Sequence, residues 1–108
     1  MTSKPGYAVK RTELVMAGPN VQARVFTLAP GENIPWHYHD EITDHYFALQ
    51  GTLVVRTREP DDIRELQIGD RHQITPGIAH LIANERDVDC RFLLLQGGGT
   101  YDWIKVSA

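Results

Sequence analysis

Short apolar segments alternate with turn residues along almost the whole chain, and this alternation constrains the fold more than any other feature. No stretch keeps a convincing helical period over ten or more residues. Runs of about four to eight residues rich in Val, Ile, Leu and Phe, bounded by Gly, Pro, Asn and Asp, are typical of β-strands. Several such strands at regular spacing predict an all-β sandwich or barrel.

The expected strands start near residues 14–16 and continue to an aromatic segment near the C-terminus. After the first, they cover 21–28, 46–49, 52–57, 63–68, 70–74, 80–83, 90–96 and 100–106. The Gly97–Gly99 run lacks the Lys and Ser or Thr of a phosphate-binding loop, so we interpret it as a flexible hinge before the last strand. We found no internal repeat, and the 108 residues predict a single domain with a barrel core at about 20–96.

Charge and hydropathy exclude several classes of partner. The formal net charge is −3 and no basic stripe runs along the sequence, so nucleic acid is not an expected partner. The apolar runs are too short to cross a membrane. The first residues lack the apolar stretch of a secretory signal, which predicts a cytoplasmic protein.

The sequence offers no protein nucleophile beside its histidines. Cys90 is the only cysteine, and it begins an apolar run, which indicates a buried structural thiol. Ser3, Ser107 and Lys105 lie at the ends of the chain. Nucleophilic catalysis needs an activated side chain within hydrogen-bond reach of a base, so any turnover is expected to depend on a metal ion.

The placement of three histidines indicates a metal site. His37 and His39 are two residues apart, so on a strand both imidazoles project from the same face. Asp44 lies nearby, and His80 follows a Pro-Gly turn at the start of another expected strand, which a hairpin can bring beside the pair. Such a pair of histidines is common by chance, so the spacing of the surrounding residues has to show whether this pair belongs to a metal-binding motif.

Two spaced motifs make the chain resemble the cupin superfamily, and in particular its small single-domain members. The first motif reads Gly31, five residues, His37-Tyr38-His39, four residues, Asp44, six residues, Gly51. The second reads Gly69, five residues, Thr75-Pro76-Gly77, two residues, His80, three residues, Asn84. The chain departs from the family pattern at Asp44, where Glu is usual, and at Thr75, where Pro is usual.

The resemblance implies a double-stranded β-helix of the jelly-roll type with one divalent metal ion inside its mouth. The implied ligands are His37, His39, Asp44 and His80, and the ion is Fe, Mn, Zn, Ni or Cu. Because Asp is one methylene shorter than Glu, Asp44 has three possible roles: a direct ligand, a ligand through water, or no ligand. Glu41 and His45 are nearby substitutes, although alternation directs His45 to the other face.

Two further side chains are candidates for proton transfer. Tyr46 shares a strand face with Asp44, although an aromatic residue on a strand is more often core. His72 shares a face with Ile74 and lines the interior if Ile74 does; the competing interpretation is a satisfied polar residue near the barrel mouth.

The sequence leaves two classes of function open. The resemblance favours a metal-dependent enzyme acting on a small organic substrate, of dioxygenase, isomerase or decarboxylase type. The alternative is a cupin module that binds or senses a small molecule or metal without turnover. In either case we expect a homodimer, because an open jelly roll leaves sheet edges that must be covered. The apolar segment near residues 14–16, together with the aromatic C-terminal segment that contains Tyr101 and Trp103, is the expected contact.

Overall fold

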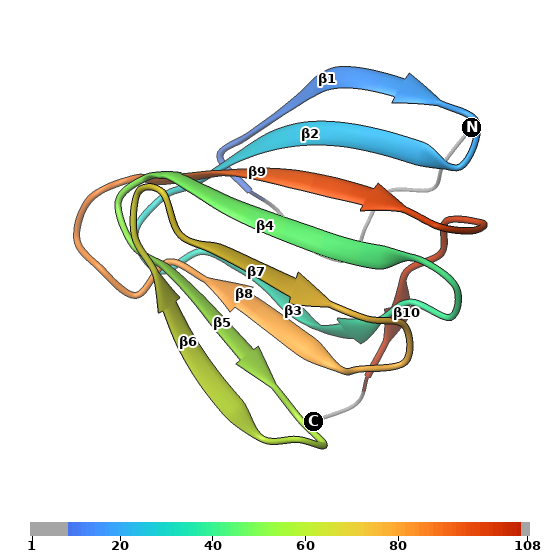
Figure 1. Ribbon diagram of the computed structural model, residues 1–108. Coiled ribbons are helices and arrows are strands. Elements are labelled where there is room, and N and C mark those ends of the chain that lie inside the picture. Colours follow the sequence, from blue (N-terminus) through green and yellow to red (C-terminus); the bar gives the residue numbers. More distant parts are fainter. Residues whose placement is uncertain (1–8, 107–108) are drawn as a thin grey trace.

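Two five-stranded antiparallel sheets face each other in the computed structural model, which describes residues 9–106 (Figure 1). The first sheet has the order β1 (Arg11–Gly18), β2 (Val21–Leu28), β9 (Cys90–Gly97), β4 (Thr43–Gln50) and β7 (Arg71–Ile74). The second has the order β10 (Ile104–Lys105), β3 (Asn33–Tyr38), β8 (His80–Ala83), β5 (Leu53–Thr57) and β6 (Asp62–Leu66). The expected all-β jelly roll is confirmed. Within the described residues there is no helix that could cross a membrane.

The core lies between the sheets and follows the alternation of the strands. Along β9, buried residues alternate with half-buried ones, which places Cys90, Phe92 and Leu94 on the inner face. Phe92 is fully buried and stacks on Phe26 of β2, with ring centroids 5.1 Å apart. Aromatic pairs of this kind stabilise a core beyond the apolar area that they bury. The inner face of the first sheet therefore contributes a stacked aromatic pair to the core.

Asn84, the last residue of the second motif, fixes the closed end of the barrel. Its buried side-chain amide donates to the carbonyl oxygens of Leu28 at 2.9 Å and Val88 at 2.7 Å. Its carbonyl oxygen Oδ1 accepts from the backbone N–H of Arg86 at 3.0 Å. Buried backbone groups need hydrogen-bond partners, and this one side chain supplies a partner to three of them. An amide suits the position because it both donates and accepts hydrogen bonds.

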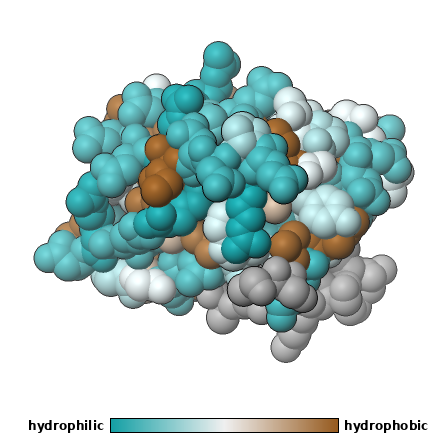
Figure 2. Space-filling view, turned by 90° about the horizontal axis from the view of Figure 1, so that it is seen from below, coloured by the Kyte–Doolittle hydropathy of each residue, from teal (hydrophilic) through white to brown (hydrophobic). Residues whose placement is uncertain are grey.

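The second sheet turns a mainly hydrophilic face outward (Figure 2). Ion pairs cross the surface of this sheet and its loops: Arg56 with Glu85, Arg64 with Asp62, and Arg86 with Glu65. These mixed charges form a solvated surface, where each pair adds little stability.

The C-terminal segment differs from its prediction. The expected strand over 100–106 is wrong in length, since only β10, Ile104–Lys105, pairs with β3. The preceding glycines also pack closely rather than forming an open hinge: a Cβ on Gly99 would lie 2.6 Å from Cβ of Glu41. The carboxylate of Glu41 accepts from the backbone N–H of Thr100 at 3.2 Å. These local contacts direct the segment toward the barrel mouth instead of along a sheet edge.

Candidate metal centre

Four buried side chains converge at the barrel mouth. His37 lies near the end of β3, and His39 directly follows that strand. Asp44 lies on β4, and His80 begins β8. Each offers one ligand atom, and these atoms all lie within 4.8 Å of one another. None of the four residues is more than 3% exposed. The structure thus brings together the residues that the sequence indicated, in a cluster that could hold a metal ion.

Strand pairing positions the three imidazoles. His37 and His80 face each other across the β3–β8 ladder, and their ring centroids are 4.2 Å apart. His39 joins them from two residues further along, with its ring centroid 5.0 Å from that of His37. The backbone N–H of Gly77 donates to the carbonyl of His39 at 2.8 Å, which ties the turn before His80 to the first motif. Gly77 has a φ of +84°, a conformation that glycine adopts without strain.

Backbone carbonyls orient all three rings. Nδ1 of His37 contacts the carbonyl of Pro35 at 2.8 Å, and Nδ1 of His80 contacts that of Ile78 at 2.8 Å. Nδ1 of His39 contacts the carbonyl of Asp102 at 2.5 Å. Because a carbonyl oxygen only accepts, each Nδ1 carries a proton, and in the neutral ring Nε2 keeps the lone pair. This is the arrangement that fixes a histidine as a metal ligand.

Hydrogen bonds also fix the carboxylate of Asp44. The Tyr46 hydroxyl donates to Oδ2 at 2.8 Å, and the Gln96 amide donates to Oδ1 at 2.9 Å. Oδ2 lies 3.1 Å from Nε2 of His80 and 3.3 Å from Nε2 of His39. Zinc–ligand bonds of about 2.0–2.2 Å place neighbouring ligand atoms roughly 3–3.5 Å apart, so this spacing matches that of ligands around one ion.

The donor set fits a divalent metal. Nε2 of His39 is buried and makes no hydrogen bond among the described residues. Buried polar atoms are rarely left in this state, so such an atom calls for an explanation. Imidazole nitrogens with one carboxylate suit zinc, iron, copper and nickel. An ion bonded to the Nε2 atoms would satisfy His39 and balance the charge of Asp44.

The electrostatics favour a charged carboxylate beside neutral His37. Burial and the neighbouring His80 lower the pKa of His37 to about 3, so this ring is neutral at physiological pH. Burial opposes the charged form of Asp44, but the close His39 and His80 rings outweigh it and hold the Asp44 pKa below its usual range. Burial also opposes the charged form of His39, but the Asp44 carboxylate outweighs it and raises the pKa. The Asp44 carboxylate is therefore charged within the cluster, and the His37 ring beside it is neutral.

The two candidates for proton transfer lie in different surroundings. Tyr46 is buried against the cluster and its hydroxyl donates to Asp44, which makes it a positioning residue for the carboxylate. His72 faces Tyr46 across the β4–β7 ladder and is half-buried. Burial and the positive charge of Arg64 on β6 lower the pKa of His72. Its charged neighbours are therefore residues of β6 rather than members of the cluster.

The substitute ligands lie outside the cluster. His45 is half-buried, and strand alternation turns it away from Asp44. Glu41 is exposed, and its carboxylate contacts the backbone of Thr100. Cys90 is fully buried, and burial raises the pKa of its thiol to about 11, as expected for an unreactive cysteine.

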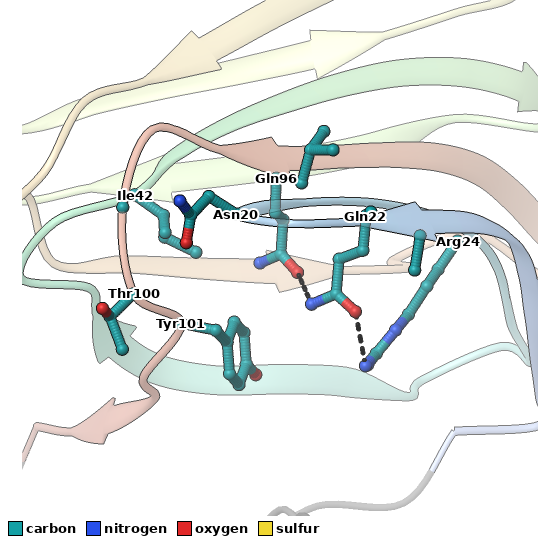
Figure 3. A pocket seen from close by; sticks show the side chains of 11 residues that line it. Asn20, Gln22, Arg24, Ile42, Gln96, Thr100 and Tyr101 are labelled. Carbon is teal, nitrogen blue, oxygen red and sulfur yellow. Dashed lines mark hydrogen bonds between the residues drawn. The ribbon is translucent and has the colours of Figure 1, made fainter.

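One small cavity adjoins the cluster, and a larger hollow lies beyond it. The inner cavity, of about 10 Å³, is lined by His37, Tyr46, Trp103 and their apolar neighbours. The outer hollow, of about 290 Å³, opens between β2, the end of β9 and the C-terminal segment (Figure 3). Arg24, Gln96 and Tyr101 line both spaces and so form the boundary between them.

Aromatic side chains of the C-terminal segment cover the cluster. Trp103 stacks on the ring of His37, with centroids 4.9 Å apart and planes 19° apart. Tyr101 lies beside His39, with centroids 5.8 Å apart. These two aromatic side chains therefore cap the barrel mouth. They shield the cluster from bulk water, which strengthens electrostatic interactions within it.

The sequence reading missed the polar residues around the cluster, including Gln22, Arg24 and Gln96. A signal for them existed. Gln22 and Arg24 lie on the same inner face of β2 as Phe26. Gln96 lies on the same inner face of β9 as Phe92 and Leu94. A polar side chain at an inward position of an otherwise apolar strand indicates a site.

Comparison with known proteins settles the family. A model of the cupin domain matches residues 24–96. The chain belongs to the cupin family. Among curated protein sequences, none matches this cupin significantly.

Solved structures show the same fold at low sequence identity. A protein with a double-stranded β-helix domain from Klebsiella pneumoniae superposes with a TM-score of 0.80 and 18% identity, over 97% of this chain and 90% of that one. A Thermus thermophilus protein gives 0.76 and 22%, over 89% and 90%. An oxalate oxidase gives 0.70 and 19%, over 81% of this cupin but only 46% of the oxidase. Identities this low show a shared fold and no more.

Proposed function

We propose that this cupin holds one divalent metal ion through His37, His39, His80 and Asp44, and that it is an enzyme acting on a small organic substrate. The observation that supports it most strongly is the orientation of the rings: backbone carbonyls hold all three Nδ1 atoms, and the Nε2 atoms meet at one carboxylate. A purely structural cluster has no need for three rings preset in this way.

The protein's own residues would prepare the reaction. A bound ion would supply Lewis acidity, or the ability to activate oxygen, toward a substrate oxygen. Tyr46 and Gln96 hold Asp44 in one orientation, while Trp103 and Tyr101 exclude water from the cluster. His72 stays a candidate for proton transfer to groups at the barrel mouth, as the sequence suggested.

The similar structures suggest several classes of reaction and do not single out one. They include the oxalate oxidase above and a sugar phosphate isomerase of the cupin superfamily from Silicibacter pomeroyi, which gives a TM-score of 0.66 at 21% identity. Small oxygenated molecules are named in both. We therefore propose a substrate of this kind, with dioxygenase, isomerase and decarboxylase chemistry as the reactions to test.

One observation favours a binding protein instead. The inner cavity beside His37 has a volume of about 10 Å³, which is room for one water molecule at most. A substrate must either displace Trp103 or reach the cluster from the outer hollow. A metal-binding or sensing cupin without turnover would need no such entry, so it is the second candidate function.

Chelation separates the two candidates. We expect the purified protein to contain a divalent metal by elemental analysis and to consume oxygen or convert a substrate with one member of a panel of small acids, diols and phenols. Removing the metal should abolish that activity, and one particular metal, such as Fe(II) or Mn(II), should restore it. Thiol and serine reagents should have no effect, because no nucleophile belongs to the cluster. Turnover that persists in verified metal-free protein would contradict the proposal.

The Asp44→Ala variant is expected to weaken metal binding without abolishing it. Three imidazoles supply most of the affinity, and carboxylates are optional ligands in many sites. We expect a loss of roughly 10–100-fold, similar to that caused by losing a partner that orients a ligand. Titration with a competing chelator measures it. Asp40→Ala removes an exposed carboxylate close to the site and should leave the affinity unchanged. A loss as complete as that of His39→Ala would contradict this role.

We further propose that this cupin forms a homodimer through β1. This strand is an edge of its sheet, and Leu14, Val15 and Met16 are 64%, 57% and 69% exposed. Leu14 pairs with Arg24 and Met16 with Ala23, which lie on opposite faces of β2, so the edge is apolar on both sides. An unpaired apolar edge is a template for a second copy of the same strand. The ion-paired surface of the other sheet offers no comparable contact.

Sedimentation of a double variant tests the dimer. At micromolar concentration the unmodified protein should sediment at twice the chain mass of 12.2 kDa. Val15→Lys with Met16→Lys should shift it to the single-chain mass, since like charges would face each other across the pair. Ile63→Lys is the matched control: Ile63 is also 57% exposed but lies on β6, the edge of the other sheet. A 12.2 kDa species from the unmodified protein would refute the dimer.

A further inference from the structure

Arg24 is a charged residue in an otherwise neutral hollow. Of the eleven described residues that line the outer hollow, Arg24 alone carries a charge. It shares the inward face of β2 with Phe26, where a cation is unusual. In Figure 3 its guanidinium reaches into the same space as the Tyr101 ring.

The guanidinium has no carboxylate partner among the described residues. Arg56, Arg64 and Arg86 form ion pairs with surface carboxylates, whereas Arg24 donates only to Oε1 of Gln22, at 2.9 Å. An arginine has five N–H donors arranged in a fork that matches a carboxylate. A half-buried guanidinium with most of these donors unused is suited to bind an anion.

Two glutamines connect Arg24 to the metal centre, and we call this pair the amide chain. Gln96 donates from Nε2 to Asp44, so its Oε1 accepts from Nε2 of Gln22 at 3.2 Å. Gln22 then presents Oε1 to Arg24. Because a carboxylate only accepts and a guanidinium only donates, both amides have a fixed orientation. All three bonds point from the cation toward the anion, which strengthens each of them.

We propose that Arg24 binds the carboxylate group of the ligand, so that this cupin acts on, or senses, a small monocarboxylic acid. This inference deepens the proposed function and rests on it. With its carboxylate at Arg24, the acid would extend toward the cluster between Arg24, Gln96 and Tyr101, which line both the outer hollow and the inner cavity. The amide chain links occupancy of the Arg24 site to the orientation of Asp44.

Charge and size define the acid. A single guanidinium balances one negative charge, which favours a carboxylate over a dianionic phosphate. The outer hollow of about 290 Å³ lies at the lower end of the range of ligand pockets, so it suits an acid smaller than a typical drug. Tyr101 also lines the hollow, and its hydroxyl is a second hydrogen-bond donor there.

Nuclear magnetic resonance of the isotopically labelled protein tests the inference without requiring activity. Acetate, lactate and benzoate would each be titrated against their neutral amides, acetamide, lactamide and benzamide, into metal-free protein and into zinc-loaded protein. At least one acid should bind tenfold or more tightly than its amide and should shift the side-chain amide resonances of Gln22 and Gln96. Inorganic phosphate would be titrated in parallel.

Variants localise the effect. Arg24→Gln should reduce the affinity for the acid by roughly 10–100-fold, the value of hydrogen bonds to a charged group, and leave that for the amide unchanged. Arg24→Lys should recover only part of it, because an ammonium lacks the fork. Arg91→Gln is the matched control: Arg91 lies on neighbouring β9, is half-buried, and does not line the hollow.

The outcomes separate this inference from the proposed function. If zinc binds but no acid is preferred over its amide, or if Arg24→Gln and Arg91→Gln behave alike, the Arg24 site is refuted and the metal centre stands. If phosphate binds more tightly than every acid, the assignment to carboxylates is overturned. If no metal binds while an Arg24-dependent preference for acids is seen in the metal-free protein, the inference holds and the metal-dependent function fails.

Discussion

His37→Ala and His80→Ala are each expected to lose nearly all bound metal. Each variant removes one of three preset imidazoles and leaves a ligand set that no longer encloses an ion. The affinity should fall by more than the roughly 10–100-fold that accompanies loss of an outer partner of a ligand. Elemental analysis after equilibration with zinc, together with titration against a chelator, measures both content and affinity.

His45→Ala provides the matched control for these variants. His45 is adjacent to Asp44 on β4, but it is half-buried on the opposite face and lies outside the cluster. The His45→Ala variant also loses one imidazole side chain, but its metal content should be unchanged. Circular dichroism should show the same β-rich spectrum for all the variants. Full metal content in both His37→Ala and His80→Ala would refute the proposed centre.

Phe92→Ala is expected to destabilise the fold by about 3–5 kcal/mol, the usual range for truncating a buried aromatic residue. Phe92 is fully buried, stacks on Phe26 and lies 5.7 Å from the ring of Tyr46, centroid to centroid. A typical domain is stable by only about 5–15 kcal/mol, so the loss is a large share of the total. Urea denaturation followed by fluorescence measures the free energy of unfolding.

Phe47→Ala tests whether that effect belongs to the core. Phe47 lies on β4 with its ring half-buried on the outer face, 6.0 Å from the Arg71 guanidinium. The same substitution should cost about 1 kcal/mol or less there, because water already reaches the ring. Equal losses in the two variants would show that the inner face of the first sheet is not the principal core.

The sequence was sufficient to predict the fold class, and its resemblance to the cupin family was sufficient to predict which residues cluster. Strand alternation is a local property: if residues 37–39 are extended, His37 and His39 share a face. The resemblance of the two spaced motifs to the cupin family added Asp44 and His80, which the structure places on β4 and β8 of opposite sheets. The same local rule correctly turned His45 away from Asp44. Alternation depends only on residues a few positions apart, whereas the grouping of His80 with the first motif was implied by the resemblance.

The tertiary structure alone decided what surrounds the cluster. Gln22 and Gln96 are 74 positions apart, and the β2–β9 register makes them direct partners. The carbonyl of Asp102 reaches His39 only because the C-terminal segment leaves the sheet and crosses the barrel mouth. A shift of one residue in the register would turn Gln96 to the outer face and disconnect Arg24 from Asp44. Such long-range contacts follow from how the two sheets pack and pair, and no local pattern specifies the register between distant strands.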